Sequence, residues 1–144
     1  MSFQELFKQS VAQIETDLED ILQNEVLNTV DSILGRQIYE QVYTYQATPK
    51  AMESRRYDEG GLFDPENIVS HVEPGLTLIV ENDAPFQDGK PHKDALSDVV
   101  EFALPRYRQP GPRPFIRETQ KELAAGEGEK AVLNGLEARG YEVK

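Results

Sequence analysis

The chain has 144 residues, of which 26 are acidic and 15 are basic, so its formal net charge is −11. A chain of this length is expected to form one domain that buries roughly 70 % of the surface it exposes when unfolded. It contains no cysteine, which excludes a disulfide framework, a thiolate metal site and a cysteine nucleophile. The acidic balance argues against binding nucleic acid by neutralising phosphates, because that mode requires a basic face.

Neither a membrane span nor a signal peptide is expected. No apolar run approaches the roughly 20 residues that cross a bilayer. Residues 1–10 lack a basic region followed by an apolar stretch. We therefore predict a protein that folds in a cytoplasm and has no membrane partner.

Residues 1–34 are predicted to form a long amphipathic helix. Ser2 and Glu5 match a capping box, which marks the start of a helix, and Gly35 predicts a stop or a bend. The apolar side chains recur at three- and four-residue steps, namely Phe3, Leu6, Phe7, Val11, Ile14, Leu18, Ile21, Leu22 and Leu27. We interpret this stripe mainly as core of its own domain, with packing against another subunit as the alternative. Residues 37–45 fit either a continued helix or a strand.

The middle of the chain is predicted to hold a β-hairpin. Residues 46–67 lose periodicity, and loops of this length in a small domain are usually functional. Residues 67–73 and 76–82 are rich in β-formers and flank Pro74 and Gly75, which predict the turn. A polar loop over 83–93 follows.

The C-terminal part is predicted to be helical. Asp94 is expected to cap a short helix over 95–104. Four prolines within 105–114 predict an extended arm without regular structure. Helices over 115–125 and 129–139 follow, separated at Gly126 and Gly128, and Gly140 suits a left-handed C-cap. The predicted fold is a single α+β domain over 1–144, with a small antiparallel sheet.

Two clusters are candidate interface residues. The first is Arg55, Arg56 and Tyr57, because two guanidiniums on one loop can bind carboxylates in a bidentate manner. Local pairing with nearby acidic residues is its alternative. The second lies in or beside the proline arm, where a stiff segment loses little entropy on docking; its members are Tyr107, Arg108, Arg113 and Phe115. The alternative for the arm is a linker that positions the next helix.

No catalytic motif is present, and no catalytic residue, metal ligand or cofactor is predicted. His92 with Asp88 and Asp94 is the strongest candidate for a metal or acid–base site, but its spacing matches no known metal-binding helix pattern. A solvated polar loop is the preferred interpretation of these residues. His71 is expected on a strand surface.

The chain resembles the neck and tail-completion proteins of long-tailed bacteriophages. The resemblance rests on Arg55–Tyr57, on residues 60–62, on Asn67–Ile68, on the LTLIVEN run over 76–82, and above all on PGPRPFI over 110–116. It implies a long first helix, an antiparallel sheet and C-terminal helices. It also implies a non-enzymatic structural protein that forms a ring in the virion neck or at the top of the tail.

The resemblance implies three kinds of partner. They are further copies of the chain in a ring of six or twelve, with a hexamer favoured; the neighbouring neck, connector and tail-tube proteins; and double-stranded DNA that passes through without specific binding. A tail terminator is favoured over a head–tail connector ring of the adaptor or stopper type. An acidic bore would repel the phosphates of passing DNA and let the duplex slide.

Two functions of other classes compete with this expectation. One is a small metal-dependent enzyme that uses His92, Asp88 and Asp94. The other is an acidic DNA mimic that occupies a basic partner. A mimic would be a monomer or dimer, whereas a ring subunit would form a closed higher oligomer.

Overall fold

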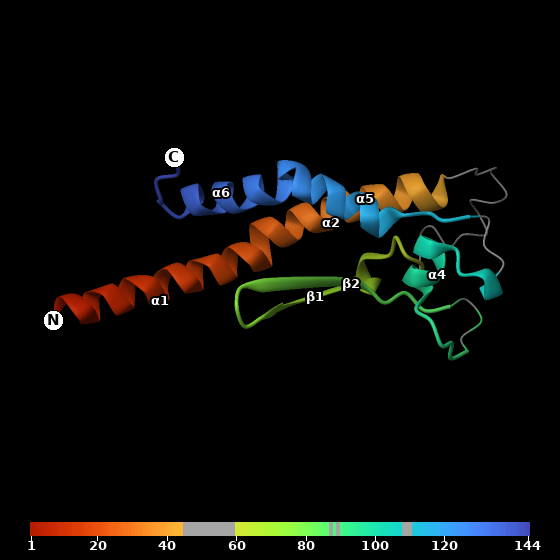
Figure 1. Ribbon diagram of the computed structural model, residues 1–144, viewed down its shortest axis with the longest axis horizontal. Helices are drawn as coiled ribbons and strands as arrows, with labels where there is room; N and C mark the ends of the chain where they lie inside the picture. Colours follow the sequence, from red (N-terminus) through yellow and green to blue (C-terminus); the bar gives the residue numbers. More distant parts are fainter. Residues whose placement is uncertain (45–59, 87, 89, 108–110) are drawn as a thin grey trace.

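One long helix organises the molecule, with a β-hairpin along one side and the C-terminal helices along the other (Figure 1). The computed structural model describes residues 1–44, 60–86, 88, 90–107 and 111–144. The predicted α+β class is confirmed, since the long first helix is accompanied by a two-stranded antiparallel sheet and by C-terminal helices. Within these residues, no helix is both long enough and apolar enough to span a membrane.

The first helix is continuous from Phe3 to Tyr43. It comprises α1 (Phe3–Ile21), a π-helical turn (Leu22–Val26), α2 (Leu27–Ile38) and a second π-helical turn (Tyr39–Tyr43). The predicted capping box is present, since the Ser2 hydroxyl accepts a hydrogen bond from the Glu5 amide and the Glu5 carboxylate accepts one from the Ser2 amide at 2.8 Å.

The predicted stop at Gly35 is wrong. A glycine inside a helix costs only about 1 kcal/mol, and burial of Ile38, Val42 and Tyr43 beyond it outweighs that cost. The ambiguous stretch from residue 37 is therefore helical as far as Tyr43.

Burial divides the first helix into two parts. Ile21 is fully buried, and Ile33, Leu34 and Ile38 follow it into the core. The large apolar side chains from Phe3 to Ile14 are all exposed. The interpretation of the stripe as core of its own domain is therefore correct from Ile21 onwards and wrong for the first four turns.

The predicted hairpin is confirmed, with strand starts shifted by one residue. Strand β1 (Ile68–Glu73) pairs with β2 (Thr77–Asn82) in antiparallel register, with Ile68 opposite Asn82 and Glu73 opposite Thr77. The turn between the strands includes Leu76, which has a positive φ of 59°. The Asn82 side chain donates to the Leu62 carbonyl at 2.7 Å, which anchors the base of the hairpin near the core.

Helix α4 (Leu96–Phe102) begins without the predicted cap. Ala95 occupies the cap position, with no side-chain hydrogen bond. Asp94 instead pairs with Arg106 at 2.9 Å and accepts from the Tyr107 hydroxyl at 3.2 Å. The pair with a cation competes successfully with the helix amides for this carboxylate. Pro105–Tyr107 forms one short 3₁₀ turn, so the arm is not wholly irregular as predicted.

The C-terminal helices meet at the predicted break. Helix α5 (Phe115–Glu122) leads through a π-helical turn (Leu123–Glu127) into α6 (Gly128–Ala138), and Gly126 supplies the kink with a φ of 130°. Gly140 has the predicted left-handed conformation, with a φ of 87°. The Gly140 amide donates to Glu137 O and the Tyr141 amide donates to Leu136 O, which is the Schellman pattern.

The main core lies where α2, α4 and α5 meet the base of the hairpin. Its buried members lie between residues 34 and 115, on the first helix, in the segments that flank the hairpin, on α4 and at the start of α5: Leu34, Ile38, Val42, Tyr43, Leu62, Ala84, Val100 and Phe115. A second contact lies nearer the N-terminal end of the first helix, called the rod below, where α6 crosses it and Gly135 meets Ile21. The two contacts together fix the C-terminal helices against the rod.

Two glycines in helices should respond oppositely to alanine. A Cβ at Gly135 would lie 2.8 Å from both Cγ atoms of Ile21, whereas a Cβ at Gly35 would meet nothing within 4 Å. We predict that Gly135→Ala lowers the free energy of unfolding by about 1–3 kcal/mol through overpacking. Gly35→Ala should raise it by about 0.5–1 kcal/mol through helix propensity and reduced freedom of the unfolded chain. Urea denaturation of both variants measures this, and a stabilising Gly135→Ala would contradict the close contact.

Candidate interaction surfaces

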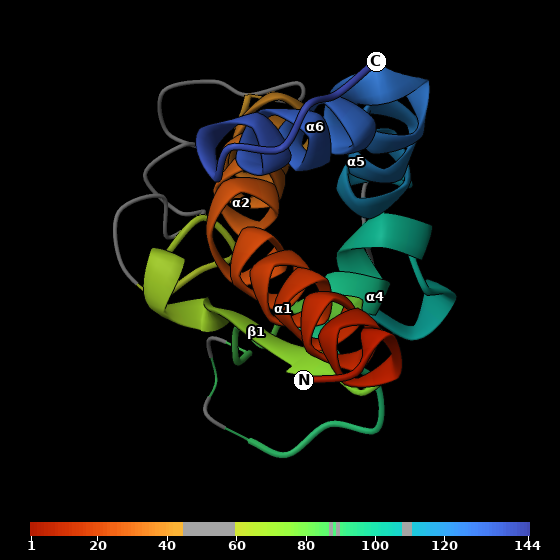
Figure 2. The ribbon, with the colours of Figure 1, turned by 90° about the vertical axis from the view of Figure 1, so that its left-hand side faces the viewer.

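The first surface is the apolar stripe on the N-terminal four turns of α1. Phe3 is 81 % exposed and Phe7 is 61 % exposed, and their rings stack with centroids 6.4 Å apart. Leu6, Val11 and Ile14 are exposed on the same segment. Figure 2 looks from this end and shows α1 projecting towards the viewer. A contiguous apolar surface of this kind on a protein is typical of an interaction site.

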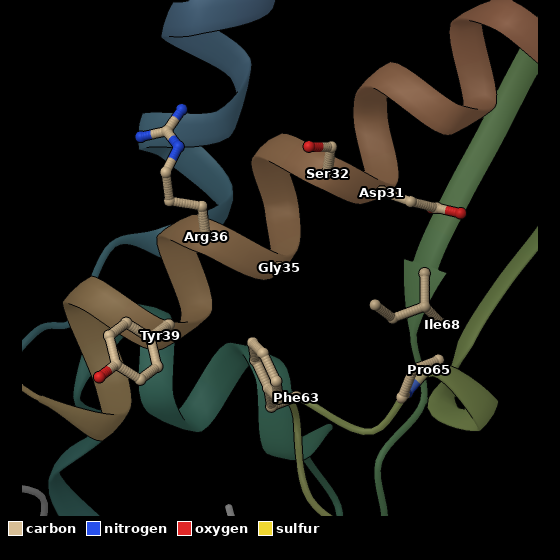
Figure 3. Close-up of a pocket in the computed structure, with 8 residues that line it drawn as sticks. All are labelled: Asp31, Ser32, Gly35, Arg36, Tyr39, Phe63, Pro65 and Ile68. Carbon is tan, nitrogen blue, oxygen red and sulfur yellow. The ribbon is translucent and has the colours of Figure 1, made fainter.

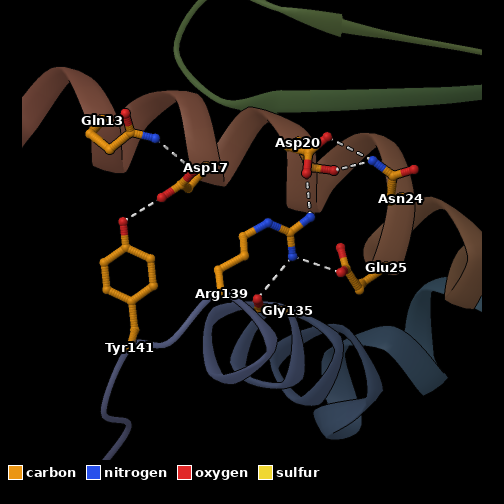
Figure 4. Close-up of polar contacts among 8 residues, drawn as sticks. All are labelled: Gln13, Asp17, Asp20, Asn24, Glu25, Gly135, Arg139 and Tyr141. Atoms are coloured by element: carbon orange, nitrogen blue, oxygen red, sulfur yellow. Dashed lines mark hydrogen bonds and ion pairs between the residues drawn. The ribbon is translucent and has the colours of Figure 1, made fainter.

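A polar clamp joins the end of α6 to the part of the first helix that directly follows this stripe (Figure 4). The Arg139 guanidinium binds Asp20 and Glu25, the latter at 2.7 Å, and donates to the Gly135 carbonyl at 2.9 Å. The Tyr141 hydroxyl donates to Asp17. Asp17 is thus bound to the segment after α6, whereas the large apolar side chains on the turns before Asp17 are exposed.

The electrostatics of the clamp favour the bound arrangement near neutral pH. The hydrogen bond from Arg139 lowers the pKa of Glu25 and keeps that carboxylate ionised. Its partners Glu25 and Asp20 raise the pKa of Arg139. The hydrogen bond to Asp17 raises the pKa of Tyr141, so the phenol keeps the proton that it donates. Each hydrogen bond thus favours the protonation state that it requires.

The second surface is an apolar groove of about 890 Å³ beside the first helix. Leu22, Val26 and Val30 of the helix form one wall, and side chains of β2 and α5 form the others. The charged residues in its lining are all acidic: Glu81, Asp83 and Asp98. The groove therefore suits an apolar group that is followed by a cation.

The third surface is a smaller pocket of about 530 Å³ between α2 and the segment that precedes β1 (Figure 3). Tyr39, Phe63, Pro65 and Ile68 supply apolar wall. Arg36 points away from it towards α5, where it pairs with Glu122. That pair lowers the pKa of Glu122.

Asp31 is the unusual group of this pocket. Its Oδ1 atom is buried and has no hydrogen-bond partner among the residues that the structure describes. Burial raises the pKa of Asp31, because a carboxylate with few polar neighbours is less stable than the neutral acid. An apolar pocket with one such carboxylate is suited chemically to a side chain with an aliphatic stem and a cationic end.

Four of the predicted interface residues cannot be placed. Arg55, Arg56, Tyr57 and Arg108 lie outside the described residues. Their roles stay predictions.

The other three belong to the packed part of the subunit. Phe115 is 0 % exposed and Arg113 is 7 % exposed. The Arg113 amide donates to Val100 O at 3.1 Å, which holds the end of the proline arm against α4. Tyr107 is half-buried and stacks on Phe86. In the single chain these three residues contact other parts of the same subunit, as expected if the arm is a linker that positions the next helix. Their contacts with other subunits stay predictions.

Sequence reasoning missed Glu101, which fixes the start of α5. This side chain of α4 is buried and accepts from the Ile116 and Arg117 amides at 2.8 and 3.0 Å. It thereby satisfies two free amides at the N-terminus of a helix whose cap residue is a proline. A cap from a residue 15 positions earlier leaves no local sequence signal.

The histidine loop assembles differently from a metal site. His92 lies 3.0 Å from Asp88 and stacks on Phe86, with ring centroids 3.9 Å apart. Backbone and His92 hydrogen bonds lower the pKa of Asp88. Asp94, the third expected member, is held by Arg106 and Tyr107. Within the described residues, no three His, Cys, Asp or Glu side chains are grouped so that they could hold a metal ion.

Comparison with known proteins identifies the family. The sequence profile of the YomN family matches residues 5–138, which is nearly the whole chain. This chain belongs to the YomN family. No curated protein and no solved structure gives a significant match to it.

Membership in the YomN family confirms part of the predicted resemblance. YomN proteins are a family derived from Bacillus phage, which is consistent with the predicted phage origin. The matched range includes both the exposed stripe from Leu6 onwards and the groove.

The buried carboxylate of this YomN-family chain gives a pH-dependent prediction. Because the folded-state pKa of Asp31 is raised, its ionisation destabilises the fold at neutral pH, and the penalty disappears as the pH falls through that pKa. We predict that Asp31→Asn raises the Tm at pH 7 and that the difference from wild type shrinks towards pH 3.

Ser32→Ala is the matched control, because Ser32 is an exposed neighbour on the same helix. Its effect on the Tm should not vary over this range of pH. A lower Tm for Asp31→Asn at pH 7 would show that the carboxylate is stabilised by an ion pair rather than penalised by burial.

Proposed function

We propose that this protein is a structural component of a phage particle whose copies form a ring at the neck or at the top of the tail. A tail-terminator or tail-completion role is preferred, and a connector ring of the adaptor or stopper type is the alternative within the same class. The proposal extends the phage origin of the YomN family to a place in the virion.

The exposed stripe on α1 is the observation that carries the proposal. A chain that functions alone has no physical reason to present Phe3, Leu6 and Phe7 to water on a projecting helix. A subunit of an assembly has such a reason, because association with another subunit buries that apolar surface. Ring closure requires a heterologous contact that repeats from copy to copy.

The charge of the chain supports a channel for DNA. Six copies would carry a formal charge of −66, six times −11. Counterions screen such charge beyond roughly 8–10 Å, so only carboxylates that line the bore would act on the duplex. An acidic bore repels the phosphates, whereas a basic bore would hold them during ejection.

The acidic charge also favours one function of another class. A net charge of −11 suits a DNA mimic that occupies a basic partner protein. Such a mimic would act as a monomer or dimer and would be absent from finished particles. Its location in infected cells therefore separates it from the proposed ring subunit.

We predict that the protein co-purifies with intact particles of a phage that encodes it. Cryo-electron microscopy of the neck should show a closed ring of this chain whose bore is lined by Asp and Glu. Particles that lack the protein would contradict the proposal. A ring with a basic or apolar bore would contradict the proposed way in which DNA passes.

A further inference from the structure

Two apolar surfaces on this chain have opposite shapes, one projecting and the other hollow. One is the donor segment, residues 3–14 of α1, which presents a projecting apolar stripe. The other is the acceptor groove, the apolar hollow beside Leu22, Val26 and Val30. One is convex and the other concave, and each exposes apolar surface that a partner would bury.

The donor segment is electrically distinct from the rest of the chain. It contains one acidic residue, Glu5, and one basic residue, Lys8, so the whole net charge of −11 lies outside it. It can therefore approach another copy without the repulsion that two acidic surfaces would experience. Lys8 follows Phe7 and lies about 100° further round the helix, so its cation lies to one side of the apolar stripe.

The acceptor groove supplies the matching features. Its floor and walls are mostly aliphatic or aromatic, and its charged residues, Glu81, Asp83 and Asp98, are all acidic. Its volume of about 890 Å³ is at the upper end of the roughly 300–1,000 Å³ typical of clefts that enclose a ligand.

The donor segment cannot enter the groove of its own chain. Leu22, Val26 and Val30 of the groove belong to the same unbroken helix as the donor segment. Figure 1 shows α1 leading away from the body of the molecule, beyond the hairpin turn and the end of α6. A helix without a hinge does not fold back on itself, so a donor of this sequence must come from another copy.

We propose that residues 3–14 of one copy lie in the acceptor groove of a second copy. Phe3 and Phe7 pack on its apolar wall, and Lys8 faces the acidic rim. Each copy has one donor and one groove, so the contact can repeat from copy to copy. This inference rests on the proposed function in naming the contact that would join the subunits of the ring.

Sedimentation velocity of the full chain over a range of concentrations tests the donor. The double variant Phe3→Ser/Phe7→Ser should raise the dissociation constant of self-association at least about 10-fold, as expected for aromatic hot spots. Both side chains are exposed, so the variant should keep its circular dichroism spectrum and Tm. Phe102→Ser is the matched control, because Phe102 is 64 % exposed but lies on α4 and does not line the groove. Its self-association should equal that of wild type.

A mixing experiment tests the pairing of donor with groove. The variant Leu22→Glu/Leu76→Asp adds charge to the groove and leaves the donor intact. Asp tolerates the left-handed backbone at residue 76. A Tm close to that of wild type confirms that the groove variant folds. If the double variant is unstable, Thr77→Glu alone replaces it, because Thr77 is an exposed residue that lines the groove. The groove variant and the donor variant should each stay monomeric, and a mixture of the two should form a complex of two chains.

Three results would overturn the inference. They are a wild-type chain that stays monomeric at every attainable concentration, a donor variant that associates as tightly as wild type, and a mixture of the two variants that stays monomeric. Other results would contradict the proposed function without contradicting this contact. Association limited to two copies, or self-associating protein that is absent from particles, would support the donor–groove contact and contradict the ring in the virion.

Discussion

The close crossing of α6 over the first helix is the contact at which the exposed part of this helix gives way to its buried part. It requires a residue without a Cβ at Gly135, because Ile21 fills the space that a methyl group would take. Arg139 then binds Asp20 and Glu25, and Tyr141 reaches Asp17. These contacts fix the position along the rod at which the cover by the C-terminal helix ends.

The division of the first helix follows from that crossing. Residues from Ile21 onwards contribute to the core, and the earlier turns project into solvent. The π-helical turn at Leu22–Val26 lies within the crossing, since its Glu25 binds Arg139, and two of its other residues, Leu22 and Val26, line the groove. The same rod therefore carries a donor surface and part of an acceptor surface, separated by the place where α6 is attached. A subunit built in this way is suited to joining others of its kind, which agrees with the structural role proposed for it.

Local signals in the sequence predicted the elements well and their surroundings poorly. The capping box at Ser2, the hairpin turn after Pro74 and the C-cap at Gly140 each depend on residues a few positions apart, and all three were predicted correctly. The apolar period of the first helix gives Phe3 and Ile21 the same signal. Only the packing of Gly135, more than a hundred positions later, separates the exposed residue from the buried one.

The candidate interface residues show the same limit. Phe115 follows a proline-rich arm, and that composition indicates a docking segment. Phe115 is instead buried in the core, and Glu101 of another helix caps the start of α5 beside it. Asp94 has the spacing of a helix cap, and Arg106 binds it instead. Each of these outcomes depends on a competing partner that periodicity and spacing do not reveal.

Hydrogen–deuterium exchange along the first helix tests the central claim most directly. In a dilute solution of single chains, amides before Ile14 should exchange much faster than those after Ile21, with the change in rate at the α6 crossing. At concentrations where copies associate, residues 3–14 and the groove should become protected together. Equal protection from Phe3 to Ile38 in dilute solution would contradict the division of this helix into a free part and a covered part.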